Sequence, residues 1–188
     1  MSVAAVVLAA GASSRMGRPK ALIEWRGRPF FMHCSARASD AGCAPVVVVW
    51  GATALPEGAA SLVHNPTWWD GPLSSLQAGL RAVVPSGPSA VLVLTVDRPH
   101  VQADTLEQLL AAHAAAPAHV VQPEYERRRG HPIVLPASLL NDVLALPPTD
   151  TLRSVVGRSD VVRTFVHVED AAVRDNLDTP DDLRRLPA

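Results

Sequence analysis

Apolar and polar positions follow two rhythms along this chain, one typical of strands and one of helices. Short runs that are apolar throughout, such as AVLVLTV, predict strands buried on both faces. Such runs predict strands over residues 4–8, 45–50, 61–64, 90–96, 118–122, 133–135 and 161–168. Apolar residues at helical spacing and end signals predict helices over residues 29–41, 74–84, 103–115 and 138–146, with a short helix from residue 179.

Strands that are apolar on both faces need helices on each side. The element order therefore predicts a three-layer α/β/α fold with a mostly parallel sheet and right-handed crossovers. Gly42 is expected to end the first helix, and Ser74 is expected to cap the second. The 188 residues contain no linker, repeat or low-complexity segment, so we expect one domain over residues 1–188.

Composition narrows the class of protein. The chain is 48% hydrophobic and 19% charged, values typical of a globular protein. Its net charge of −1 gives no indication of a nucleic-acid or membrane partner. Cys34 and Cys43 lie outside any CxxC pair, so we expect two buried thiols. With no signal peptide or membrane-spanning run predicted, the expected location is the cytoplasm.

The segment 6–20, VVLAAGASSRMGRPK, carries the strongest candidate chemistry. A strand breaks into a loop of small residues, and two cations, Arg15 and Lys20, follow. Small residues let backbone N–H groups approach an anion, which the cations neutralise, so the loop predicts a nucleotide phosphate site. The alternative is an ordinary turn with solvated charges. Neither the P-loop GxxxxGK[ST] nor the dinucleotide fingerprint GxGxxG is present.

Two carboxylates are candidate metal ligands. Asp97 follows the strand at 90–96, and ligands of open α/β sheets bind beyond such strand ends. Mg²⁺ typically takes one or two carboxylates together with phosphate oxygens. Asp178 precedes Thr179 and Pro180, which suit a helix start. The alternative for both acids is to complement a helix N-terminus.

Three further positions are candidates for substrate contact. Ser74 and Ser75 open an amphipathic helix, where hydroxyls can read a base or simply cap the helix. His131 lies in a Gly-His-Pro loop beside the basic run 127–129, which indicates either an acceptor site or a solvated face. No GxSxG elbow, HExxH motif or paired CxxC indicates nucleophilic or zinc chemistry.

These motifs together resemble those of the MobA-like nucleotidyltransferases, which include the molybdenum-cofactor cytidylyl- and guanylyltransferases. The resemblance runs in the family order through residues 6–20, 65–80, 93–99, 130–135 and 175–183. It implies a Rossmann-like nucleotidyltransferase fold, with Asp97 and Asp178 holding Mg²⁺ and His131 near the acceptor. Arg98 departs from the Gln that is frequent beside the metal-binding Asp. The resemblance implies catalytic roles for Arg15, Lys20 and Asp97, and nucleotide contacts from Leu8, Ala10, Gly11, Ser13, Ser14, Arg15, Lys20, Ser74 and Ser75.

The reaction implied is transfer of a nucleotide to a phosphorylated acceptor with release of pyrophosphate. A phosphate nucleophile is already anionic, so the reaction needs positioning and charge neutralisation rather than a general base. The Ala-Ala-Gly start at Ala10 resembles the cytidylyltransferase branch more than the guanylyltransferase branch, which implies CTP first and GTP second. The resemblance implies molybdopterin as the acceptor, with a sugar or polyol phosphate as the alternative. The alternatives are a nucleotide-sensing module without turnover and a redox enzyme on a Rossmann-like sheet, which would lack its glycine fingerprint.

Overall fold

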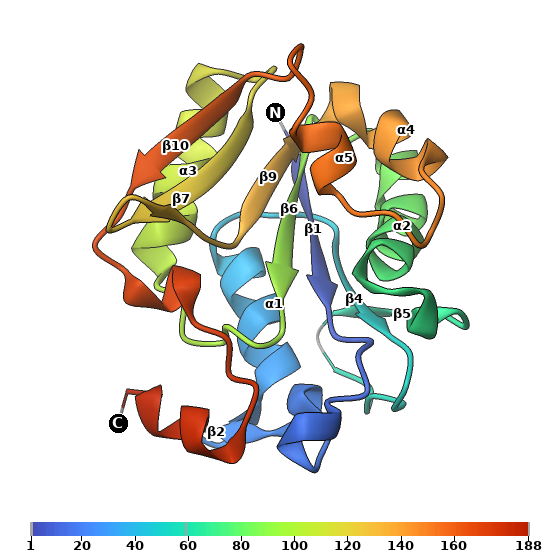
Figure 1. Cartoon of the computed structure of the whole chain (residues 1–188), viewed down its shortest axis with the longest axis vertical. Helices are drawn as coiled ribbons and strands as arrows, with labels where there is room; N and C mark the ends of the chain where they lie inside the picture. The colour runs from blue at the N-terminus through green and yellow to red at the C-terminus, as the bar shows by residue number, and fades with distance from the viewer. Residues whose placement is uncertain (1, 59, 188) are drawn as a thin grey trace.

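The computed structural model describes residues 2–58 and 60–187, and a twisted sheet runs through the centre of the molecule (Figure 1). In the described part of the chain, its strands follow the order β10-β7-β9-β6-β1-β4-β5, with β8 paired to β7. The strands are β1 (Val3–Leu8), β4 (Val46–Trp50), β5 (Ser61–His64), β6 (Ala90–Thr95), β7 (Val120–Tyr125), β8 (Arg128–Arg129), β9 (Ile133–Pro136) and β10 (Arg163–His167). β9 runs antiparallel to β6 and β7, and the pairs along β6-β1-β4-β5 are parallel. This confirms the mostly parallel sheet.

The centre of the sheet places two chain segments side by side. β1 pairs with β6 in register from Val3 opposite Ala90 to Leu8 opposite Thr95. β4 lies on the other side of β1, so the strand order reverses there. Ligands of open α/β sheets bind at such a reversal, beyond the carboxyl ends of the strands. The loops after Leu8 and Thr95 therefore start from the favoured position for a site.

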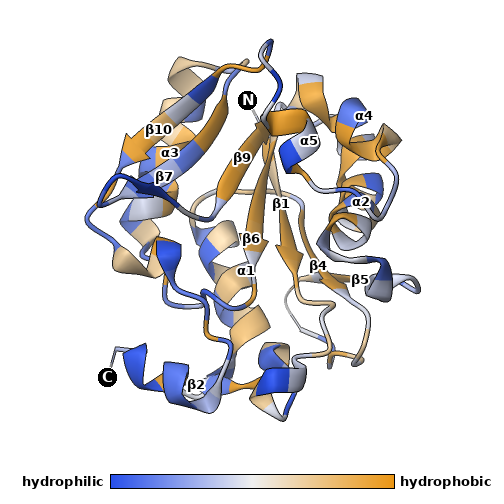
Figure 2. Ribbon diagram, in the orientation of Figure 1, coloured by the Kyte–Doolittle hydropathy of each residue, from blue (hydrophilic) through white to orange (hydrophobic). Residues whose placement is uncertain are grey.

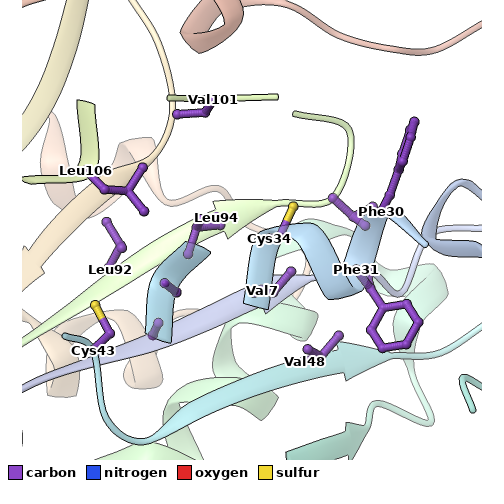
Figure 3. Packing of buried hydrophobic residues seen from close by; sticks show 14 of the residues in the cluster. Val7, Phe30, Phe31, Cys34, Cys43, Val48, Leu92, Leu94, Val101 and Leu106 are labelled. Atoms are coloured by element: carbon purple, nitrogen blue, oxygen red, sulfur yellow. The ribbon is translucent and has the colours of Figure 1, made fainter. Parts of the chain in front are cut away.

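Helices cover both faces and complete three layers. α1 (Phe30–Asp40) and α3 (Ala103–Ala115) pack on one face, whereas α2 (Pro72–Val83), α4 (Ala137–Ala145) and α5 (Arg153–Val156) pack on the other. Hydropathy is highest on the strands and on the helix faces turned toward them (Figure 2). Figure 3 shows Cys34 of α1 beside Leu94 of β6 in the first of these cores, with Phe30 farther along α1.

Both cysteines are free and buried, as expected. Burial raises the pKa of the Cys34 thiol to about 12 and that of the Cys43 thiol to about 11. A thiol with such a pKa carries almost no thiolate near neutral pH, and the thiolate is the reactive form. Cys34 and Cys43 therefore act as small apolar core residues.

Several boundaries depart from the sequence prediction. α2 begins at Pro72 after Gly71, so the expectation that Ser74 caps this helix is wrong; Ser74 lies inside the first turn. The short helix after residue 179 is confirmed as a 3-10 helix, η6 (Pro180–Arg185), with a capping box between Thr179 and Asp182. The hairpin β2 (Glu24–Trp25) and β3 (Arg28–Pro29), the strand β8 and the helix α5 were not predicted.

No helix among the described residues combines the length and the apolar character needed to cross a membrane.

Candidate active site

The loop after β1 folds back on itself and presents two cations. Ser13 adopts a left-handed backbone with φ of 54°, and its hydroxyl accepts a hydrogen bond of 3.0 Å from the backbone N–H of Lys20. Two single-turn helices, η1 (Ser14–Met16) and η2 (Lys20–Leu22), lie on this loop. The small residues between β1 and η1 make this turn possible without bulky side chains over the loop.

Both cations of the loop form ion pairs with the Asp178 carboxylate. Lys20 Nζ contacts Asp178 Oδ1, and Arg15 Nη2 lies 2.8 Å from Asp178 Oδ2. The hydrogen bond from Lys20 and the charges of Lys20 and Arg15 lower the pKa of the Asp178 carboxyl. The Arg15 side chain is 72% exposed, whereas that of Lys20 is only 14% exposed. Lys20 is therefore the more firmly held of the two cations.

Asp97 follows β6 and forms an ion pair with Arg98. Arg98 Nη1 lies 2.9 Å from Asp97 Oδ1 and 2.5 Å from Thr95 Oγ1, while Nη2 contacts Asn176. The backbone N–H of Leu177 donates to the carbonyl of Asp97 at 3.3 Å. These bonds join the end of β6 to the C-terminal segment that carries Asp178.

A cavity of about 500 Å³ lies over these loops. It gathers residues from the loops after β1 and β6, from the entry to α2 and from the C-terminal segment. Of the residues expected to bind nucleotide or metal, it is lined by Leu8, Ala10, Gly11, Ser13, Ser14, Arg15, Lys20, Ser75, Asp97 and Asp178. Segments far apart in sequence thus bring the two candidate phosphate-binding cations and both candidate metal ligands to one cavity.

The two serines at the entry to α2 differ in their surroundings. Both are 4% exposed, and Asn65 Nδ2 donates to the two hydroxyls at 2.9 Å and 3.0 Å. Ser74 Oγ also lies 2.8 Å from the Gly71 carbonyl, and Ser74 does not line the cavity. Ser75 does line it. The geometry therefore gives Ser74 a role in holding the loop before α2 and leaves Ser75 available to a ligand.

His131 lies apart from the other candidates, in a second cavity of about 630 Å³ that adjoins the first. The two cavities share Leu8, Pro72 and Thr95. Burial lowers the pKa of the His131 imidazole to about 4, and the nearby Arg98 guanidinium adds to this effect. His131 is therefore neutral near pH 7 and supplies a hydrogen bond rather than a charge.

The candidates taken from the sequence leave out part of the lining. Trp69, Gly71, Pro72 and Thr95 also face the first cavity, and Trp69 is 67% exposed. An exposed tryptophan beside a cavity offers a flat ring to a ligand. The available signal was the Trp-Trp pair before the Gly-Pro turn, which is ambiguous because paired aromatics also serve packing.

Two carboxylates in the first cavity suit a divalent metal. Among the described residues, no group of three or more His, Cys, Asp or Glu side chains forms a metal site. Asp97 and Asp178 offer hard carboxylate oxygens in the same cavity as the loop with Arg15 and Lys20. Mg²⁺ is commonly held by one or two carboxylates and by substrate phosphates, so the residues present fit a metal that arrives with a nucleotide.

Comparison with known families identifies the family of the chain. A family model described as "MobA-like NTP transferase domain" matches residues 5–163. The chain belongs to this family. The match includes the loop with Arg15 and Lys20, and also Asp97 and His131, and it ends before Asp178. The chain is thus a nucleotidyltransferase of the MobA and IspD type, whose members act on nucleoside triphosphates.

Relatives with similar sequences carry more than one activity in their names. Nicotine blue oxidoreductase of Paenarthrobacter nicotinovorans is 31% identical, with 98% of this chain and 96% of that protein covered. A probable molybdenum cofactor guanylyltransferase of Mycobacterium avium is 27% identical, with 99% and 95% covered.

Solved structures agree on the fold. A nucleotidyl transferase from Methanothermobacter thermautotroptrophicus superposes with a TM-score of 0.81 and 25% identity, with 98% and 95% of the two chains covered. A manganese complex of a Mycobacterium tuberculosis protein superposes with a TM-score of 0.72 and 22% identity, with 99% and 98% covered. These matches confirm the Rossmann-like nucleotidyltransferase fold.

Proposed function

We propose that this protein transfers a nucleotide from a nucleoside triphosphate to a phosphorylated small molecule, with Mg²⁺ as the cofactor and release of pyrophosphate. One observation carries the proposal: Arg15, Lys20, Asp97 and Asp178 line a single cavity at the reversal of strand order. That arrangement supplies two cations for phosphates and two carboxylates for a metal. Leu8, Ala10, Gly11, Ser13 and Ser14 form the rest of the proposed phosphate wall.

Charge neutralisation is the main contribution of these residues. Lys20 and Arg15 now pair with Asp178, and a bound triphosphate would replace the carboxylate as their partner. Both cations then face the negative charge that develops on the departing pyrophosphate. A metal held by Asp97 and Asp178 would neutralise phosphate oxygens. Positioning supplies the remainder, because the acceptor phosphate is already a nucleophile.

The base and the acceptor are assigned on narrower grounds. The resemblance of the Ala-Ala-Gly start at Ala10 to the cytidylyltransferase branch supports CTP over GTP. The Ser75 hydroxyl and the Trp69 ring offer contacts to a base at the entry to α2. The acceptor occupies the second cavity, beside His131. The mycobacterial relative named as a molybdenum cofactor guanylyltransferase supports molybdopterin as the acceptor, with a sugar or polyol phosphate as the alternative.

Thermal shift and pyrophosphate release test this function together. We expect one nucleotide among CTP, GTP, ATP and UTP to raise the melting temperature only with Mg²⁺; saturation at 100 times Kd corresponds to about 2.7 kcal/mol. Asp97→Asn and Asp178→Asn should each remove the Mg²⁺-dependent shift. Asp181→Asn, an exposed acid outside both cavities, is the matched control and should keep it. A full shift in Asp97→Asn would overturn the metal assignment.

The relative named nicotine blue oxidoreductase favours a second candidate, a redox reaction on this fold. The loop 11–20 does not contain GxGxxG, although its cations Arg15 and Lys20 suit a dinucleotide's pyrophosphate as well as a triphosphate. NADH and NADPH therefore belong in the same thermal-shift series. A shift with either of them, and none with a triphosphate, would favour this candidate.

A further inference from the structure

The second cavity has an unusual charge pattern for a protein of net charge −1. One acid, Asp150, faces it. Its arginines come from separate parts of the chain and are Arg98, Arg129, Arg153, Arg163 and Arg174. Local sequence does not explain such a gathering, because the loop after β6, β8, α5, β10 and the turn η5 (Ala171–Arg174) each contribute one.

Most of these arginines are also without ion-pair partners. Apart from Arg98, which pairs with Asp97, those lining the cavity make no ion pair with any described carboxylate. Arg158 and Arg184, outside the cavities, do have such partners, at 2.6 Å from Asp142 and 3.3 Å from Asp181. Other exposed arginines, such as Arg81, have none among the described carboxylates, so the second cavity is distinguished by the convergence of its arginines on one hollow. Unpaired guanidinium groups that face one hollow form a ready site for anions, because they match carboxylate and phosphate oxygens.

Three of these arginines occupy two separate places. Arg98 lies at the junction with the first cavity, the proposed nucleotide cavity, where it contacts Asp97 and Thr95. Arg129 and Arg163 lie around the ring of Phe165 on β10, with guanidinium carbons 4.2 Å and 5.8 Å from its centroid. In the sheet, β9 and β7 separate β6 from β10. One anionic group therefore cannot contact both places, so an anion at the junction and an anion beside Phe165 would be two separate groups of a ligand.

The surface between the two places is largely apolar. Register across the sheet aligns Val93, Ile133, Gln122 and Phe165, and the first three of these line the cavity. Val156 of α5 also faces it. A ligand body that lies here would contact aliphatic side chains, with Gln122 and neutral His131 as hydrogen-bonding groups.

We propose that the acceptor is a phosphate ester with a second anionic group at the far end of an apolar or ring-shaped body. The reacting phosphate lies near Arg98 and His131, and the second anion lies at Arg129 and Arg163. This inference rests on the proposed function, because it treats the second cavity as the acceptor site. It narrows the acceptor class by excluding simple polyol monophosphates, which carry one anionic group and no apolar body.

Two probes that differ by one anion test the proposal. Phenyl phosphate carries one anionic group, and 4-carboxyphenyl phosphate adds a carboxylate across the ring. Calorimetric titration of the protein with each probe should give at least about tenfold tighter binding of 4-carboxyphenyl phosphate, since a charge-assisted hydrogen bond contributes that much or more. The double variant Arg129→Gln/Arg163→Gln should lose this preference and keep its affinity for phenyl phosphate.

A matched control removes the same charge elsewhere. Arg81→Gln/Arg184→Gln replaces two exposed arginines outside both cavities and should keep the preference. Equal binding of the two probes by the wild type, binding of neither, or a preference that survives Arg129→Gln/Arg163→Gln overturns the proposal. The Mg²⁺-dependent thermal shift with nucleotide, measured on the same samples, tests the proposed function independently of the acceptor. A carboxylate preference in a protein that neither binds nor cleaves triphosphates overturns the acceptor role.

Discussion

At the scale of single residues, the candidate metal ligand Asp178 and its two cations depend on one another. Asp178 holds Lys20 and Arg15 in position, and they in turn keep its carboxyl ionised. Replacing Asp178 by Asn would leave the Lys20 ammonium, only 14% exposed, without its anion. An unpaired, partly buried charge destabilises the folded state.

We therefore predict a pH-dependent loss of stability in Asp178→Asn. The native pKa of Asp178 lies below its unfolded value of about 3.9, so its stabilising effect is present above that pH and is lost as pH falls through the native pKa. The difference between wild type and Asp178→Asn in the free energy of unfolding should be larger at pH 7 than at pH 3. Urea unfolding at both values measures it.

Asp181→Asn is the control for that measurement, because both members of the Arg184–Asp181 pair are more than four-fifths exposed. It should change stability little at either pH. An Asp178→Asn deficit of the same size at pH 7 and pH 3 would contradict an ionised Asp178 as the source of the effect.

At the scale of elements, the close approach of α2 to the sheet depends on a glycine. A Cβ on Gly79 would lie 2.4 Å from Val6 Cγ1 of β1 and 3.0 Å from Val49 Cγ2 of β4. The strands cannot give way easily, because Val6 and Val49 are fully buried in the core. Since α2 begins at Pro72, its position also sets the entry that faces the nucleotide cavity.

Gly79→Leu should therefore destabilise the protein by about 1–3 kcal/mol or more, as overpacking of a filled core does. Ala82→Leu, on an exposed position of the same helix, should change the free energy of unfolding by less than about 0.5 kcal/mol. Urea unfolding of both variants makes the comparison. Similar stabilities for the two would show that α2 can move off the sheet.

The same scale explains how far the sequence predicts the fold. The predicted strands and longer helices are confirmed with small shifts at their ends, because continuous apolar runs and helical spacing report burial directly. β2, β3 and β8 each contain two residues, and α5 contains four, so they are too short to show a period. The prediction of a serine cap on α2 was wrong because Gly71 and Pro72 already start the helix.

The sequence likewise predicts some residues of the candidate site and not others. Residues within one motif, such as Gly11, Ser13 and Arg15, were found because neighbours in sequence line the same cavity. The arginines of the second cavity come from elements up to 76 positions apart, from Arg98 to Arg174, and have no common spacing. Their grouping depends on the sheet order, which a single sequence does not specify.

At the scale of the whole molecule, two adjoining cavities with different walls imply two separable binding events. The nucleotide cavity is lined by the loop after β1, the entry to α2 and the segment with Asp178, whereas the second cavity reaches α5 and β10. Hydrogen exchange followed by mass spectrometry resolves these regions, because ligand contacts suppress local opening.

Nucleotide with Mg²⁺ should slow exchange in residues 9–20, 71–75 and 175–180 and leave α5 and β10 unchanged. Addition of 4-carboxyphenyl phosphate should then slow exchange in α5, β8 and β10. In the Arg129→Gln/Arg163→Gln variant the first effect should persist and the second should disappear, because only the second cavity has lost charge. Slowed exchange in α5 and β10 with nucleotide alone would contradict two separate sites, since the triphosphate would then span both cavities.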